Sequence, residues 1–123
     1  MSELRANTIS AANGTDPVTL TKQSAAKAWF QIIQDTSHTI EGSFNVASIT
    51  DGGAGETSVT FTNAMANNDW SGVLTAQSSN NRRAVNNAPN TTRIKVEVYQ
   101  VASNTSPIDA SGGVSGQVHG DLA

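Results

Sequence analysis

The chain has 123 residues, of which 37% are apolar, 5% aromatic and only 14% charged, and its formal net charge is −3. This length suits one domain. The absence of cysteine excludes disulfides, thiol catalysis and cysteine-based zinc sites, and the negative charge argues against nucleic acid as a partner, because such binding needs a basic field. The sequence has no apolar run long enough to span a membrane and no apolar signal-peptide core at its N-terminus, so we expect synthesis in the cytoplasm without membrane insertion.

The remaining residues are mostly Ser, Thr, Asn, Gly and Ala. Disordered chains are poor in apolar residues but rich in charge, whereas this chain is poor in both and still contains strand-like runs. A thin core of this kind can be completed by neighbouring copies, because a small domain buries only a modest part of its surface. Composition therefore favours an extracellular or virion β-protein that forms oligomers.

The first 26 residues are predicted to form an attachment or trimerisation segment, ahead of an antiparallel β domain over residues 27–123. Isolated apolar residues stand there among small polar ones, namely Leu4, Ile9, Val18 and Leu20. We expect this segment to order only by pairing with other chains or by docking on a particle. Over residues 21–34 the apolar spacing fits both a helix and a strand, and we favour a short helix over the Ala-rich part followed by a strand from about Lys27.

From residue 38 onward the alternation of apolar and polar residues predicts strands. We expect one strand near residues 38–50, a Gly-rich turn at 51–55 and a returning strand over 57–62. The apolar residues predicted to share a face are Ile40, Phe44 and Val46 in the first strand, and Val59 and Phe61 in the second.

Three further strands complete the predicted fold. One lies near residues 70–76, a second over 93–98 after a long polar loop at 79–92, and a short one near the C-terminus. Their alternating residues are Trp70, Gly72, Leu74 and Ala76, then Ile94, Val96 and Val98, then Val114 and Val118. We therefore expect a mainly β fold, an antiparallel β-sandwich-like domain with a short N-terminal extended or helical segment, in a homotrimer.

Several runs along the chain resemble phage tail-fibre-type virion structural proteins, a family of small trimeric fibre or knob proteins. They are LRANTI at 4–9, TLTKQSAAKAW at 19–29, SFNVASITD at 43–51, VTFT at 59–62 and GDLA at 120–123. The chain departs from the family pattern after Trp29, at Trp70, where the family often has Tyr, and throughout the loop at 79–92. These departures mark the places where attachment or target specificity would differ.

The resemblance implies a homotrimer with a β-sandwich-like tip, located in the virion after assembly in the host cytoplasm. Its expected partners are other copies of the chain, tail or capsid proteins and a host cell-surface glycan. The residues expected at the trimer interface or in the core are Leu20, Trp29, Phe30, Ile32, Phe44, Val46 and Phe61. A capsid decoration protein, of the cement or head-fibre kind, is the alternative role, and a polysaccharide-degrading tailspike fragment is a more remote one.

The two histidines are weak evidence for a metal-binding site. Trimeric fibres can hold a metal on their axis with His pairs one residue apart, and His38 lacks the second histidine of such a pair. A single His38 from each of three copies could still supply three ligands, but an exposed histidine at a strand end is the simpler interpretation. We expect neither a metal nor a cofactor.

Two pairs of carboxylates flank predicted turns. Asp51 and Glu56 lie on either side of the Gly-rich turn, where paired carboxylates could perform the acid–base chemistry of a glycosidase. That chemistry also needs a sugar groove lined by aromatic residues, which this chain scarcely has. We interpret both carboxylates, together with Asp35 and Glu41, as solvated ends of hairpins, and we expect no enzymatic activity.

The polar loop at 79–92 is the predicted contact surface, comprising Asn80, Asn81, Arg82, Arg83, Asn86 and Asn87. The two arginines could bind an anionic glycan or a capsid partner, because the guanidinium fork matches carboxylates. A solvated loop without a binding role is the other interpretation, and the sequence leaves both open.

Overall fold

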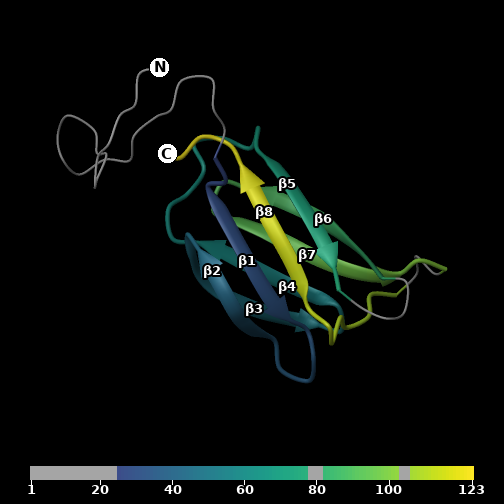
Figure 1. The fold of residues 1–123 in the computed structure, drawn as a ribbon. Helices are drawn as coiled ribbons and strands as arrows, with labels where there is room; N and C mark the ends of the chain where they lie inside the picture. The colour runs from purple at the N-terminus through teal and green to yellow at the C-terminus, as the bar shows by residue number, and fades with distance from the viewer. Residues whose placement is uncertain (1–24, 78–81, 103–105) are drawn as a thin grey trace, which may run out of the picture.

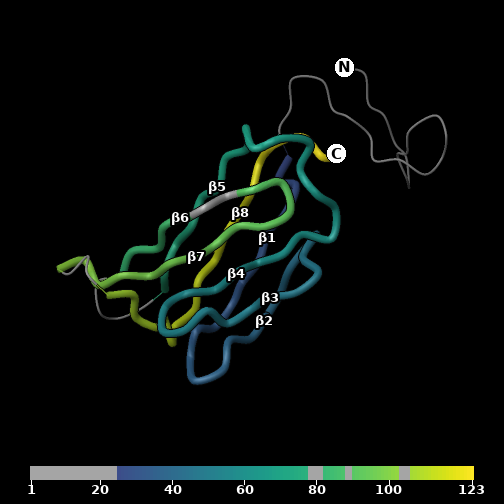
Figure 2. The backbone as a smooth tube through the Cα atoms, turned by 180° about the vertical axis from the view of Figure 1, so that it is seen from behind, coloured from purple at the N-terminus to yellow at the C-terminus, as the bar shows by residue number. Residues whose placement is uncertain are grey.

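The computed structural model describes residues 25–77, 82–102 and 106–123, which form two antiparallel sheets of four strands each (Figure 1). Sheet A has the strand order β2-β1-β8-β5 and sheet B the order β3-β4-β7-β6. The strands are β1 (Ala28–Ile33), β2 (Thr39–Phe44), β3 (Val46–Gly53), β4 (Glu56–Phe61), β5 (Ser71–Ala76), β6 (Arg82–Asn90), β7 (Arg93–Gln100) and β8 (Val114–His119). Figure 2, seen from behind, shows sheet B as the layer nearer the viewer.

The prediction of a mainly β, sandwich-like fold is confirmed for this part of the chain, in which no residue is helical. The strand expected from about Lys27 is β1. The short helix expected before it falls almost wholly outside the described residues. The same holds for the predicted attachment segment and its apolar residues, Leu4, Ile9, Val18 and Leu20.

The core lies between the two sheets and follows the period-2 pattern of the strands. In β1, β4, β7 and β8 alternate side chains point inward and are buried, while those between them point outward. The buried apolar side chains are Ala28, Phe30, Ile32, Val59, Phe61, Met65, Ile94, Val96, Val98, Ala110, Val114 and Val118. Of the residues predicted for the core or interface, Phe30, Ile32 and Phe61 thus lie in the core of the single chain, and Val46 packs against its edge.

Asn45 divides the segment that was predicted as one strand near residues 38–50. Its backbone φ is 57°, in the left-handed region that Asn tolerates better than most residues. Its side-chain amide donates to the carbonyls of Lys27 (3.0 Å) and Asn63 (3.1 Å), and its Oδ1 accepts from the Asn63 amide (2.7 Å). The single-strand prediction is therefore wrong, because the chain leaves sheet A after Phe44 and enters sheet B at Val46.

The prediction of a loop at 79–92 is also wrong for most of these residues. Residues 82–90 form β6, which pairs with β7 in a register that matches Arg83 to Tyr99 and Asn87 to Lys95. Asn and Arg have no strong strand preference, so pairing with the regular β7 decides this conformation. Asn80 and Asn81 lie outside the described residues.

Candidate functional site: the outer face of sheet A

One cross-strand row of side chains runs across the whole outer face of sheet A. Trp29 on β1 pairs with Phe44 on β2 and with Gln117 on β8, and Gln117 pairs with Val73 on β5. The three apolar members are unusually exposed, with relative accessibilities of 44% for Trp29, 55% for Phe44 and 62% for Val73. We call this set, Phe44, Trp29, Gln117 and Val73, the aromatic row.

A second row lies beside the aromatic row and is polar. Gln31 on β1 pairs with Gly42 on β2 and with Ser115 on β8, and Ser115 pairs with Thr75 on β5. We call this set, Gly42, Gln31, Ser115 and Thr75, the polar row. On β1, β2 and β5 a large apolar side chain of the aromatic row is therefore followed by a polar side chain or a glycine, whereas β8 contributes a polar side chain to both rows.

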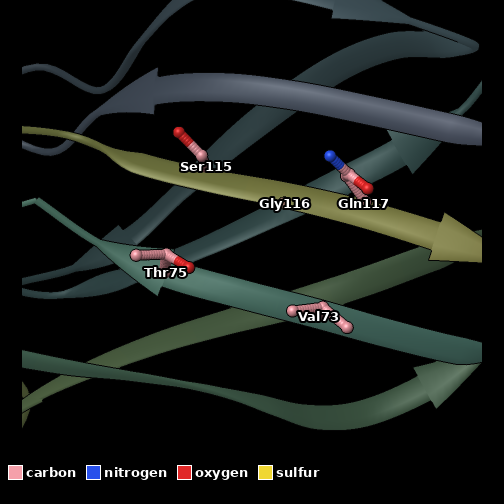
Figure 3. A pocket seen from close by; sticks show the side chains of 5 residues that line it. All are labelled: Val73, Thr75, Ser115, Gly116 and Gln117. Atoms are coloured by element: carbon pink, nitrogen blue, oxygen red, sulfur yellow. The ribbon is translucent and has the colours of Figure 1, made fainter.

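An open depression lies between β5 and β8, lined by Val73, Thr75, Ser115, Gly116 and Gln117 (Figure 3). Its walls come from both rows, so it offers hydroxyl and amide groups beside one apolar side chain. Gln77 Nε2 donates to Ser115 Oγ at 3.4 Å at one end of this surface. The lining contains no aromatic ring.

The outer face of sheet B is chemically different, because charged side chains occupy it. Lys95 Nζ lies 3.0 Å from Glu56 Oε2 and 2.9 Å from Glu97 Oε1. Glu97, only 4% exposed, also accepts hydrogen bonds from Asn87 (2.6 Å) and from the Tyr99 hydroxyl (2.7 Å). Neither row on sheet A contains a charged residue, so these rows differ in chemistry from the outer face of sheet B.

The electrostatics of the sheet B network favour its charged form. Burial by itself raises the pKa of the Glu97 carboxyl, but the hydrogen bonds from Lys95, Tyr99 and Asn87 outweigh it and hold that pKa below its usual value. The hydrogen bonds to Glu97 and Glu56 raise the pKa of Lys95, and donation to Glu97 raises the pKa of Tyr99. The network is thus an ion cluster in which Lys95 pairs with both Glu56 and Glu97.

His38 is not the exposed strand-end residue that was expected. Its side chain is 2% exposed, with Nδ1 at 2.8 Å from Thr57 Oγ1 and 3.6 Å from Asp51 Oδ1, and Nε2 at 3.5 Å from Asp109 Oδ1. These contacts all lie within one chain. Across the described residues, no cluster of three or more His, Asp or Glu is arranged to hold a metal ion.

The carboxylates Asp51 and Glu56 do not face each other. Asp51 Oδ1 accepts from the Gly53 amide at 2.8 Å and lies on the His38 side, whereas Glu56 points to Lys95 on the outer face of sheet B. The geometry thus separates the two groups that a glycosidase interpretation would bring together. Asp35 caps its own turn, with Oδ1 2.8 Å from the Thr36 amide.

The residues of the predicted contact loop are distributed over both faces of β6. Arg83 lies over the Tyr99 ring, with 5.3 Å from its Cζ to the ring centroid, and Asn87 binds Glu97. Asn86 faces the other way, and within the part of the chain that the structure describes its Oδ1 and the Nε of Arg82 are buried without a hydrogen-bond partner. A contact role for these residues stays a prediction.

Sequence reasoning missed Val73, Gln31 and Gln117 as members of an exposed face. The available signal was Val73, an apolar residue at an outward position of the strand whose alternate members, Gly72, Leu74 and Ala76, point inward. Trp29 gave a similar signal, since it falls between the inward Ala28 and Phe30.

Comparison with protein-family models found no model that matches the chain, and comparisons with curated proteins and with solved structures found no match either. None of the described residues belongs to a helix long and apolar enough to cross a membrane. The fold and the outer faces of its sheets are therefore the structural basis for a functional proposal.

Proposed function

We propose that this protein is a structural subunit of a bacteriophage virion, a homotrimeric tail-fibre- or spike-like protein that contacts the host surface or neighbouring virion proteins. It works by binding, without a catalytic step and without a cofactor. The resemblance to phage fibre-type proteins in five runs of sequence supports the virion role. The two-sheet antiparallel fold is of the class that this resemblance implies.

The observation that carries the proposal is the exposed and uncharged aromatic row on the outer face of sheet A. Trp29, Phe44 and Val73 stand exposed there in one row. Contiguous apolar groups on a protein surface mark contact sites, and a catalytic pocket would instead be concave with perturbed titratable groups. Glu97, a carboxylate whose pKa is lowered, is held by hydrogen bonds on the other sheet.

Two measurements test this function. Native mass spectrometry of the purified chain is expected to give a trimer, and a monomer at micromolar concentration would contradict the proposal. Quantitative mass spectrometry of particles that carry the protein is expected to find a few trimers per particle. A copy number near one trimer per local symmetry site of the capsid would identify a decoration protein instead.

An assay for sugar release tests the absence of catalysis. Incubation of the chain with host surface polysaccharide is expected to release no reducing ends. Release that disappears in both Asp51→Asn and Glu56→Gln would show that the protein is a polysaccharide-degrading enzyme.

A further inference from the structure

The aromatic row is exposed in the single chain, yet its composition is typical of the centre of a protein–protein interface. Interface centres are rich in aromatic residues and poor in charge. Trp29 and Phe44 on adjacent strands, with Val73 at the far edge of the sheet, give the row this character across all four strands. The charged network around Lys95 and Glu97 is confined to the other sheet, so the sandwich has one face suited to water and one suited to burial.

We infer that the outer face of sheet A is the surface through which copies of this chain associate, with three copies placing it around a common axis. This inference rests on the trimer of the proposed function and names the surface that forms it. Because neither row contains a charged residue, copies can meet there without burying an unpaired charge, which would be costly. The amides of Gln31 and Gln117 each carry donors and an acceptor, so they can pair with the same side chains of a neighbouring copy.

The width of the sheet fits a triangular arrangement. Strands lie about 4.8 Å apart, so the four strands of sheet A make a face about 19 Å wide. Three such faces forming a triangle leave about 5.5 Å from each sheet to the axis, close to half of the 10 Å or so that separates packed sheets. Ordinary side chains therefore fill the centre, whereas four faces around a square leave about 10 Å to the axis and a channel instead of a core.

A glycan is the alternative ligand for this face, because indole, amide and hydroxyl groups can all bind sugars. The arrangement of the apolar groups favours a second copy instead. Phe44 and Val73 lie on opposite edge strands, β2 and β5, about 14 Å apart by strand spacing. A sugar stacked on Trp29 and the adjacent Phe44 would leave Val73, two strands away, exposed, and the depression between β5 and β8 offers it no aromatic ring.

Lysine substitutions on the two outer faces test the inference. Trp29→Lys and Val73→Lys place charge in the aromatic row, at positions that are exposed in the single chain and therefore tolerate a long polar side chain. Thr50→Lys is the matched control, because Thr50 is exposed on β3 and points outward from sheet B. We expect the trimer mass to fall to the monomer mass in the two sheet A variants and to persist in the control, with unchanged far-ultraviolet circular dichroism.

Cross-linking gives a second readout that does not depend on breaking the assembly. The chain has no cysteine, so Gln117→Cys introduces a single thiol near the centre of the face and Thr50→Cys places one on sheet B. A short bis-maleimide is expected to join Gln117→Cys chains and not Thr50→Cys chains. A wild-type trimer that persists in both sheet A lysine variants, with no cross-link at residue 117, overturns this inference and leaves the face open to a glycan, while the proposed trimer stands. A wild-type monomer or dimer instead contradicts the proposed trimer itself.

Discussion

The indole of Trp29 on β1 lies across Gly42 on β2. A Cβ placed on Gly42 would stand 3.4 Å from Cζ3 and 3.5 Å from Cη2 of that ring, which is van der Waals contact. The absence of a side chain at residue 42 lets the ring lie over the adjacent strand, with 44% of the Trp29 surface still exposed. This contact places the indole over β2 as well as β1, at one end of the aromatic row.

Substitution by alanine is expected to change the free energy of unfolding in opposite directions at Gly42, on the outer face of sheet A, and at Gly116, on its inner face. Gly42→Ala meets only ordinary contact and removes the flexibility of a glycine in a strand, so we expect the free energy of unfolding to rise by about 0.5 kcal/mol. Gly116 stands opposite Phe30 inside the sandwich, where an added Cβ would overlap the Phe30 ring. We expect Gly116→Ala to destabilise by about 2 kcal/mol or more. Urea unfolding of the pair measures both, and equal stabilities would contradict this account.

Asn45→Ala should destabilise the turn between the two sheets by about 2–4 kcal/mol, through left-handed strain and the loss of its three side-chain hydrogen bonds. Asn45→Gly removes the same hydrogen bonds but adopts the positive φ without strain. Its expected loss is therefore smaller, and chemical denaturation of the two variants separates the contributions. A glycine variant as unstable as the alanine variant would show that strain has no part.

Thr57→Val tests the buried polar group beneath His38. The Thr57 hydroxyl accepts a hydrogen bond from Gln34 Nε2 (2.9 Å) and lies 2.8 Å from His38 Nδ1. Valine has nearly the same shape and leaves both groups without that partner, so we expect a loss of about 1–3 kcal/mol in thermal or urea unfolding. Thr50→Val, on the exposed strand β3, is the control and should change stability by less than about 0.5 kcal/mol.

Glu97→Gln should reduce stability at neutral pH by about 1.5–3 kcal/mol, because it replaces a carboxylate that receives charge-assisted hydrogen bonds. The pKa of Glu97 is lower in the folded chain than its ordinary value of 4.5. Its contribution is therefore complete above that value and is lost as pH falls through the lower folded pKa. Urea titrations at pH 7 and at pH 3 should find a smaller difference between wild type and variant at the lower pH. A difference that grows on acidification would contradict the assignment.

The alternating strands were predictable because their signal is local. In β4, β7 and β8 the inward residues Val59, Ile94 and Val114 recur with the period of two that any strand imposes on its side chains. The strand β6 was missed, because Asn and Arg residues carry no such signal and its conformation comes from pairing with β7. The break at Asn45 was missed for a related reason, since a left-handed residue becomes favourable only where Lys27 and Asn63 supply its partners.

The same division applies to the candidate site. The local pattern predicted antiparallel strands, and the composition showed that charge is scarce. Trp29 points away from Phe30 because residues 28–33 form a strand, which the apolar spacing alone left open. The register of four strands far apart in the chain then places Trp29, Phe44, Gln117 and Val73 in one row. Packing between distant segments also buries the His38 side chain and leaves Trp29, Phe44 and Val73 exposed, and the local pattern does not show either result.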